Sequence, residues 1–154
     1  MKLLPLTLIL FYSLNTYAFS HPLLALSEGA STYVDSESSL YVFGGEVTPT
    51  QNCQHTPHRV GTDRFIKIDF AKSTKDILKE GPHPSPRTRA TLVSDTDNKR
   101  LILFGGRSRK KKSGKYQLHN DLWIYDIEED TWGRITPKGQ EPAPRRDIPK
   151  SCGF

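Results

Sequence analysis

Short apolar runs alternate with polar turns along most of this chain, and beyond the N-terminus no run is a convincing amphipathic helix. The clearest pattern comes in the second half. It predicts strands at 89–93, 100–104, 121–127 and 131–135. Asp and Asn residues at 95–98 and acidic residues at 128–130 form the turns between them. Four short strands joined in this way predict one antiparallel sheet.

A six-residue phrase occurs twice in the chain. Residues 40–45 (LYVFGG) return as residues 101–106 (LILFGG), 61 positions later. The similarity extends on both sides, pairing 30–35 with 90–95, 65–69 with 122–126, and 81–87 with 139–145. We therefore expect residues 1–20 to precede a region, 21–147, that holds two units of about 29–81 and 82–139 and the start of a third.

A single four-stranded sheet exposes two apolar faces and is only marginally stable by itself. Sheets that stack radially cover one another's faces, which is the β-propeller arrangement. Each copy of the repeated phrase ends in two glycines, which predicts a turn with positive φ or with no room for a Cβ atom. The predicted fold class is therefore all-β. The glycines are Gly44, Gly45, Gly105 and Gly106.

The second unit resembles the kelch repeat. It has a strand, Gly-Gly, a long loop, then Asn-Asp-Leu-Trp-x-Tyr-Asp, a turn and a tryptophan. The matching residues are Gly105, Gly106, Tyr125, Asp126 and Trp132, with Gly44, Gly45 and Asp69 in the first unit. The Pro-x-Pro-Arg segments that begin at Pro84 and Pro142 also resemble the lead-ins of kelch repeats. Over residues 29–147 the resemblance implies an incomplete kelch-type β-propeller of two four-stranded antiparallel blades.

The first unit departs from the kelch pattern. It has Ile68 in place of the tyrosine and no tryptophan between Thr74 and Lys79. We therefore expect its outer strand to be a strand that packs poorly. In the second unit, Tyr125 and Trp132 are expected to bury area between neighbouring sheets, worth about 1.5–3 kcal/mol for each well-buried side chain. The resemblance thus assigns these residues to the fold, and it places function in the loops.

Two units cannot close a ring that normally has about four to eight blades. Three explanations are open: a piece of a longer propeller, assembly with other copies, or a small open array. The stop at residue 154, inside a new repeat, favours the first and predicts that 148–154 is a truncated tail. Exposed blade faces favour self-association.

The N-terminus has the three-part pattern of a secretory signal peptide over residues 1–20. Lys2 is followed by an apolar stretch at 3–14 and by small residues at Ala18 and Ser20. The stretch is shorter than the roughly 20 residues needed to cross a bilayer. The pattern predicts a secreted or periplasmic protein with no membrane span after removal of the signal. A first strand of the domain and a retained anchor are the alternatives.

The net charge of +5 comes largely from one loop in the second unit. Its cations are Arg107, Arg109, Lys110, Lys111, Lys112 and Lys115. Such a run binds polyanions, including sulfated glycans, by counterion release. The alternative is a solvated loop whose charges keep a sheet edge soluble. No aromatic residue interrupts the run, so base stacking and nucleic-acid binding are not indicated.

The chain has two cysteines, Cys53 and Cys152. In a secreted protein they are a candidate disulfide, with free thiols or partners in other blades as alternatives. His55 and His58 lie close to Cys53 in the sequence. Their spacing matches known zinc sites poorly. A nucleophilic pair of Cys53 with a histidine would need a third group to orient it, and none is identifiable. No metal, cofactor or catalytic residue is therefore assigned.

These observations predict a secreted kelch-repeat module that binds a protein or a glycan through the loops at 46–62 and 107–119, and they favour a fragment of a larger propeller over a whole one. Two alternatives stay open. The chain is a segment of a secreted kelch-propeller enzyme, similar to sialate mutarotases or copper oxidases, or it is a non-functional truncated product. The residues favour a binding module over an enzyme.

Overall fold

The computed structural model describes residues 26–47, 59–70, 74–76, 81–110, 113–140 and 142–146. The predicted signal peptide at 1–20 and the predicted tail at 148–154 lie outside the described residues. Six of the residues considered above also lie outside the described residues. They are Cys53, His55, His58, Lys111, Lys112 and Cys152.

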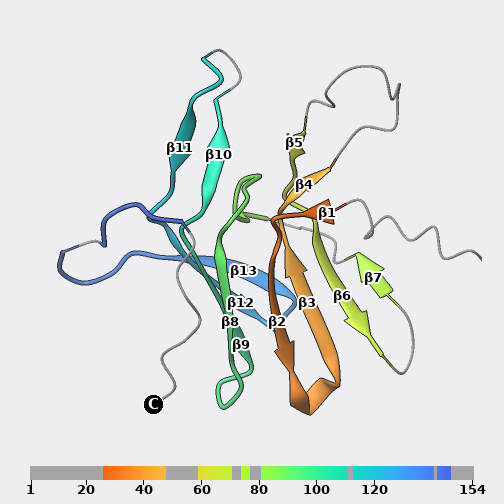
Figure 1. The fold of residues 1–154 in the computed structure, drawn as a ribbon. Helices are drawn as coiled ribbons and strands as arrows, with labels where there is room; N and C mark the ends of the chain where they lie inside the picture. The colour runs from red at the N-terminus through yellow and green to blue at the C-terminus, as the bar shows by residue number, and fades with distance from the viewer. Residues whose placement is uncertain are drawn as a thin grey trace, which may run out of the picture.

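Two four-stranded sheets form the body of the molecule (Figure 1). Blade one contains β2 (Ala30–Val34), β3 (Ser39–Phe43), β6 (Phe65–Asp69) and β7 (Thr74–Asp76), in the order β2-β3-β6-β7. Blade two contains β8 (Thr91–Asp95), β9 (Arg100–Phe104), β12 (Leu122–Asp126) and β13 (Thr131–Ile135), in the order β13-β12-β9-β8. All neighbouring strands are antiparallel.

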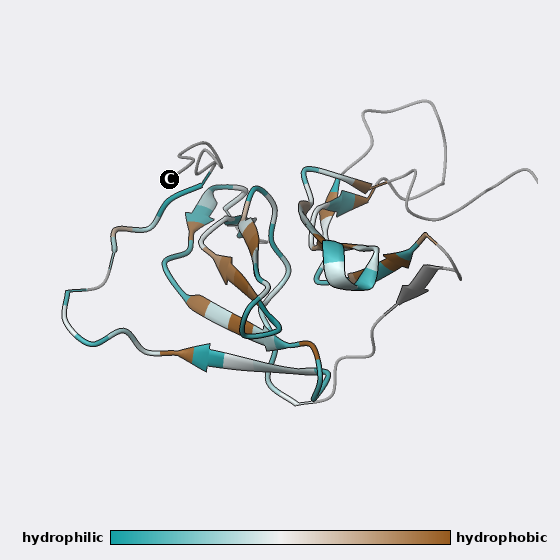
Figure 2. Ribbon diagram, turned by 90° about the horizontal axis from the view of Figure 1, so that it is seen from below, coloured by the Kyte–Doolittle hydropathy of each residue, from teal (hydrophilic) through white to brown (hydrophobic). Residues whose placement is uncertain are grey.

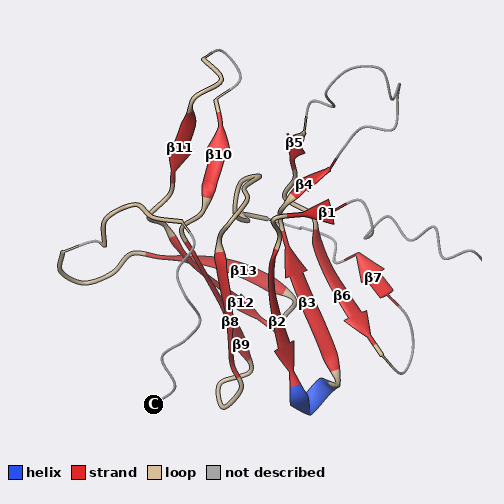
Figure 3. Ribbon diagram, in the orientation of Figure 1, coloured by secondary structure: helices blue, strands red, loops and turns tan. Residues whose placement is uncertain are grey.

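The all-β prediction is confirmed, and each unit forms one antiparallel sheet (Figure 3). Within the described ranges the one helical segment is a single 3-10 turn, Asp35–Glu37. β7 is a strand, as its alignment with the Trp132 strand predicts. The first strands of the two blades, β2 and β8, lie next to each other. This places the start of each repeat on the inner side of the array, as in a propeller.

Each blade also extends a short antiparallel hairpin, where the sequence predicts only a loop. In blade one, β4 (Glu46–Val47) pairs with β5 (Val60–Gly61) and with β1 (Leu26–Ser27). In blade two, β10 (Arg107–Arg109) pairs with β11 (Tyr116–Leu118). Both hairpins project from the same end of the blades (Figure 1).

The core lies between the two blades and is called the junction core below. Alternation along each strand points one set of side chains from blade one at blade two. The face of blade one that carries these side chains is called its trailing face. The face of blade two that it contacts is called the leading face of blade two. The aromatic rings contact across the junction: Phe65 lies 4.7 Å from Tyr125 and 5.0 Å from Trp132, and Phe43 lies 5.6 Å from Trp132, between ring centroids. The buried members are Ala30, Val34, Tyr41, Phe43, Phe65, Leu92, Leu101, Leu103, Trp123, Tyr125 and Trp132.

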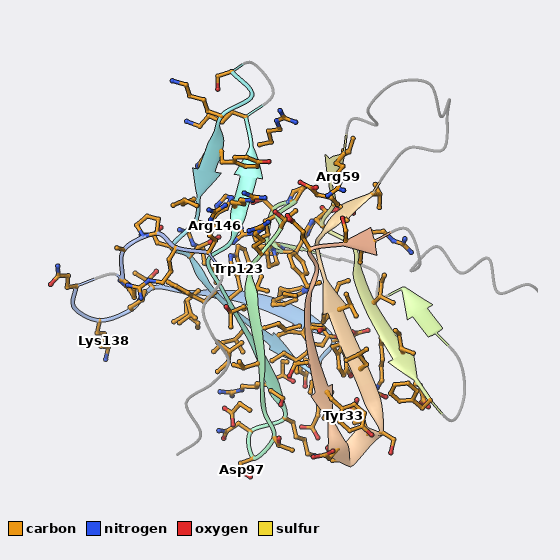
Figure 4. The ribbon with its side chains drawn as sticks, viewed as in Figure 1. Tyr33, Arg59, Asp97, Trp123, Lys138 and Arg146 are labelled. Atoms are coloured by element: carbon orange, nitrogen blue, oxygen red, sulfur yellow. The ribbon has the colours of Figure 1, made fainter. Side chains whose placement is uncertain are left out.

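Hydropathy along the ribbon follows this arrangement. Apolar positions alternate with polar ones inside the strands, whereas the turns are mostly polar (Figure 2). Side chains fill the space between the sheets, and Trp123 lies there, whereas Lys138 projects from the loop after β13 (Figure 4). Burial of the large apolar groups at this junction is therefore the main term that holds the two blades together.

Candidate binding surface

The hairpin end of each blade begins at its double glycine. Gly44 and Gly105 both have φ of +68°, and a Cβ atom on either would lie 2.4 Å or 2.5 Å from a backbone oxygen, of Arg87 and Arg145 respectively. The second glycine of each pair donates its N–H to the same oxygen, at 2.9 Å from Gly45 and 3.0 Å from Gly106. Both predicted reasons for glycine therefore hold, and the turn lets the lead-in of the next unit pass against the hairpin base.

Arg87 links the two blades beneath the hairpins, and we call its contacts the joint. Its guanidinium donates to both carboxylate oxygens of Asp121, at 2.6 and 2.9 Å, and to the Gly105 carbonyl at 3.1 Å. The Arg87 side chain is almost fully buried. Burial alone would raise the pKa of Asp121, but hydrogen bonds from Arg87 and Trp123 outweigh it and lower that pKa to about 2. The joint is thus a charged pair at neutral pH.

Glu28 holds a second ionic cluster, between the bases of the hairpins. It accepts hydrogen bonds from Arg89 at 2.6 and 3.0 Å and from Arg107 at 3.1 Å. The bond from Arg89, with help from Arg107 and against the effect of burial, lowers the pKa of Glu28 to about 2. Glu28 lies in blade one and Arg107 in blade two, so this cluster also ties the blades together.

The β10–β11 hairpin carries the predicted basic group, but its cations have different surroundings. Arg107 is buried, pairs with Glu28 and stacks over the Tyr116 ring at 4.0 Å. Arg109 is exposed and donates to the Gly114 carbonyl, at 3.2 Å. Lys110 and Lys115 are exposed. The hairpin therefore presents cations to solvent, while Arg107 fixes its base.

The hairpin has two distinct faces. Because Arg107 pairs in register with Leu118 and Arg109 with Tyr116, these four side chains share one face. Tyr116 is 49% exposed and Leu118 42% exposed. On the other face, Ser108 contacts His119, whose Nε2 lies 2.9 Å from the serine Oγ. Burial and the nearby Arg87 charge lower the pKa of His119, which favours its neutral form.

The other predicted signature residues occupy structural positions. Asp126 caps the β12–β13 turn, with its Oδ1 accepting from the N–H groups of Glu128 and Glu129 at 3.0 and 3.1 Å. Asp69 ends β6 beside the Glu37 turn. Tyr125 hydrogen-bonds to Asp130 and lies in the junction core. These residues shape the blades and lie away from the hairpin end.

The opposite end of the blades has a cavity of about 340 Å³ between the turns. Its lining mixes apolar and charged groups from both blades: Val34, Ser36, Glu37, Ser94, Thr96, Lys99, Arg100, Ile127 and Glu128. Among the described residues, no group of three or more His, Cys, Asp or Glu side chains is arranged to hold a metal ion. Nor does that part of the chain contain a helix long and apolar enough to cross a membrane.

The sequence reasoning missed both ionic groups at the blade bases. The Pro-x-Pro-Arg segment at Pro84 contains Arg87, but nothing in it marks the partner Asp121, which is 34 residues away. In the first unit Arg64 occupies the position of Asp121. Glu28 pairs with residues 61 and 79 positions further along. The repeat alignment contains one signal for the Arg87–Asp121 pair. Arginine occurs in both lead-ins, as Arg87 and Arg145, whereas the aspartate occurs only in the second unit, as Asp121.

Comparison with known proteins identifies the repeat. The family model described as the KLHDC2/KLHL20/DRC7 Kelch-repeats domain matches residues 18–152. Dynein regulatory complex subunit 7 of Chlamydomonas reinhardtii is 33% identical over 66 residues, covering 43% of this chain and 5% of that protein. Host cell factor 1 of Rattus norvegicus is 30% identical over 113 residues, covering 68% of this chain and 5% of that protein.

Solved structures were also compared with this chain. The structure of YjhT matches with a TM-score of 0.47 and 21% identity, over 76% of this chain and 30% of that one. The chain spans about one-twentieth of the length of each of the two curated relatives named above. Because the family model matches most of the chain, the chain belongs to the kelch-repeat family, and its two sheets are blades of a kelch-type β-propeller.

Proposed function

We propose that this kelch-repeat interaction module binds an acidic segment of a protein partner through its hairpin end, with the β10–β11 hairpin as the main contact. The observation that carries the proposal is the exposed face of that hairpin. It places Tyr116 and Leu118, each more than two-fifths exposed, beside the cation Arg109. An apolar side chain next to an exposed cation suits a partner segment that alternates acidic and apolar residues.

The geometry of the hairpin base supports this assignment. Arg107 stacks on the Tyr116 ring and pairs with Glu28, so the aromatic group is held in place before a partner arrives. A preorganised side chain loses less conformational entropy on binding. The names of the relatives agree with a role in assemblies, since one is a subunit of a dynein regulatory complex. We also propose that the module acts outside the cytoplasm, on the strength of the signal-like pattern at 1–20.

The cations alone would also attract a sulfated glycan. A glycan would not need the apolar side chains, whereas a protein segment would, so substitutions of those side chains distinguish the two ligand classes. The probes are a fluorescent peptide of alternating Glu and Leu residues and fluorescent heparin, each titrated against the full chain and followed by anisotropy. We expect the peptide to bind, and we expect Tyr116→Ala/Leu118→Ala to weaken it at least about tenfold, the loss that corresponds to roughly 1.4 kcal/mol. Heparin binding should depend on charge alone.

A charge-matched control locates the site. Arg109→Glu/Lys110→Glu/Lys115→Glu changes the hairpin, whereas Arg100→Glu/Arg134→Glu/Lys138→Glu makes the same change of charge at exposed positions elsewhere. Only the hairpin variant should lose peptide binding. Two results contradict the proposal: equal losses in both variants, or heparin binding with no peptide binding. The second result would assign the surface to a glycan.

A further inference from the structure

His119 closes the β10–β11 hairpin at its base. Its backbone N–H donates to the Gly106 carbonyl at 3.0 Å, and its own carbonyl accepts from the Arg145 N–H at 3.2 Å. The half-buried imidazole then reaches across to the first strand of the hairpin, where Nε2 lies 2.9 Å from the Ser108 Oγ. The ring therefore ties the two strands together on the face opposite the exposed apolar side chains.

The first unit has a residue without an ionisable group at the same place. Thr62 repeats both backbone contacts of His119: its N–H donates to the Gly45 carbonyl at 2.9 Å, and its carbonyl accepts from the Arg87 N–H at 3.3 Å. Its side chain turns to its own segment, where Oγ1 accepts from the Arg64 N–H at 3.1 Å. A side chain that titrates near neutral pH thus occupies this position only in the unit whose hairpin carries the proposed contact.

The charged groups around the imidazole belong to several segments. Arg87 of the lead-in and Asp121, just before β12, act on it directly. Both carboxylate oxygens of Asp121 already accept from Arg87, at 2.6 and 2.9 Å. Arg145, in the following lead-in, contacts the His119 backbone and is exposed. Among the described residues no carboxylate hydrogen-bonds the ring, so a proton on it would have no dedicated acidic partner. The described charged side chains of the hairpin are cations as well: Arg107, which pairs with Glu28 on the opposite face, Arg109, Lys110 and Lys115.

Only the neutral form of His119 suits this position. Burial and the Arg87 charge lower the pKa of the imidazole, and the opposing effect of Asp121 is smaller. A base whose folded pKa is depressed supports the ordered state above its ordinary pKa of 6.5, and this support is lost as the pH falls below that value. A protonated ring is better solvated in water than in the half-buried site, so it turns away from Ser108 and the hairpin loses its tie.

We propose that His119 is a positioning residue of the β10–β11 hairpin: its neutral imidazole holds the hairpin through Ser108 in the form that binds the acidic segment, and its protonation releases the hairpin. For its ligand this inference rests on the function proposed above. A positioned hairpin keeps Tyr116 and Leu118 in a fixed orientation, so less conformational entropy is lost on binding. The released hairpin binds more weakly although it is more positive, because salt screens an exposed charge.

The test measures how binding depends on pH. The peptide of alternating Glu and Leu residues is titrated against the full chain from about pH 7.5 to about pH 5.5, the range in which a histidine changes charge. Asp121 and Glu28 stay ionised there because their pKa values are about 2, and the glutamates of the peptide stay mostly ionised. We expect the affinity to fall at least about threefold toward the acid end.

Four variants separate positioning from other effects of pH. His119→Gln keeps a neutral amide that reaches toward Ser108, so it should bind more tightly than His119→Thr, which installs the residue of the first unit, and its affinity should not change with pH. Ser108→Ala should bind weakly over the whole range. His83→Gln is the matched control, because His83 is the other histidine in the described part of the chain, with Nε2 at 3.4 Å from the Asp63 Oδ2; it should keep the full fall. A flat profile of the unaltered chain, a fall that persists in His119→Gln, or tighter binding at acid pH would overturn the proposal.

A measurement without ligand separates the failure of this inference from the failure of the proposed function. NMR of the full chain with labelled histidine and tyrosine follows the His119 imidazole and the Tyr116 ring over the same pH range, and the spectrum of His119→Gln identifies the imidazole signal. We expect the Tyr116 ring, on the opposite face of the hairpin, to shift with the same midpoint as His119. If the peptide binds at no pH while the two rings titrate together, the proposed ligand is wrong and the positioning role stands. If the peptide binds and Tyr116 does not follow His119, the proposed function stands and the positioning role is wrong.

Discussion

The two blades have the same strand order but meet their neighbours differently. Tyr125 and Trp132 of blade two point back into the junction core, against Phe43 and Phe65 of blade one. The same positions in blade one fall on its other face, away from blade two, and there the chain has Ile68 and Thr74. The joint follows the same rule, because blade two has the Arg87–Asp121 pair and blade one has Leu26 and Arg64 at those places.

This difference indicates that the kelch residues belong to a junction between blades and not to a sheet by itself. A four-stranded sheet forms in both units, with the same antiparallel registers, although only unit two has the tyrosine, the tryptophan and the salt bridge. Strand pairing needs alternation and turn residues, which both units have. The signature residues then determine how firmly a blade packs on the one before it.

The largest test of this view removes a signature side chain from the junction. Trp132 is 7% exposed and contacts Phe43 and Phe65, so Trp132→Ala leaves a cavity between the blades. We expect a loss of about 3–5 kcal/mol in the free energy of unfolding, measured by urea denaturation. Ile135→Ala on the same strand is the control. Ile135 points to the other face and should cost about 1 kcal/mol or less. Equal losses would contradict the junction role.

The second test breaks the joint. Asp121→Asn keeps the shape of the side chain but leaves the buried Arg87 charge unpaired, which we expect to cost about 3 kcal/mol. The equivalent change at blade one, Arg64→Asn, leaves the Arg87–Asp121 pair intact and should have a smaller effect. The two variants are compared by urea denaturation at pH 7. If Asp121→Asn were as mild as Arg64→Asn, the joint would not hold the blades together.

The joint also predicts a pH dependence. The folded pKa of Asp121 is about 2, below its ordinary value of 3.8, and that of Glu28 is about 2, below 4.5. A depressed folded pKa contributes stability above the unfolded pKa and loses it as the pH falls toward the folded value. Stability should therefore fall between about pH 5 and pH 2. Asp121→Asn should be less stable at pH 7 but show a shallower fall over that range, and an unchanged slope would remove Asp121 from the explanation.

Much of the fold could be predicted from the sequence because its causes are local. Alternating residues and Asp- or Asn-rich turns give the strands of both units to within a few positions, and the double glycines fit the observed φ values. The extra hairpins were not predicted, because their strands are only two or three residues long and have no apolar alternation to mark them. The strands of these hairpins pair because they continue from neighbouring strands of the blade, which hold the two chain segments side by side.

The site was less predictable for a physical reason. The cations of residues 107–115 look alike as a sequence, yet Arg107 is buried and paired while Arg109 faces solvent. What separates them is Glu28, which is 79 residues from Arg107 and comes close only because the blades pack. A charge run shows where a polar surface lies, but the partners of each charge depend on tertiary contacts.

The third test compares the two glycine turns. An alanine at Gly44 or Gly105 has to adopt a left-handed backbone, at about 1–2 kcal/mol, and meets a backbone oxygen at 2.4 or 2.5 Å. At Gly44 that oxygen belongs to Arg87, which the joint holds, so we expect about 2–3 kcal/mol in total. At Gly105 it belongs to the exposed Arg145 segment, which can shift, so about 1–2 kcal/mol is expected. Gly114→Ala, with φ of +65° and its nearest atom at 3.9 Å, reports the backbone strain alone. Equal losses at Gly44 and Gly105 would mean that the joint does not stiffen the first turn.

The smallest expected effects come from the surface ion pairs of the two blades. In blade one, Lys67 donates to Glu37 at 2.6 Å, and about a quarter of each side chain is exposed; Glu37 also accepts from Tyr41 at the edge of the junction core. In blade two, Lys99 pairs with Glu128 across two turns, where more than half of each side chain is exposed.

Lys67→Met should cost about 0.5–1 kcal/mol, because the Glu37 charge loses a partner while partly shielded from water. Lys99→Met should leave the urea midpoint unchanged, since solvent and salt screen that pair. Measuring both variants at low and at high salt separates the two cases: the Lys67 effect should persist in 1 M salt. If it vanished there, the Glu37 network would be an ordinary surface pair, and the ionic support of the junction would rest on the Arg87 joint and the Glu28 cluster.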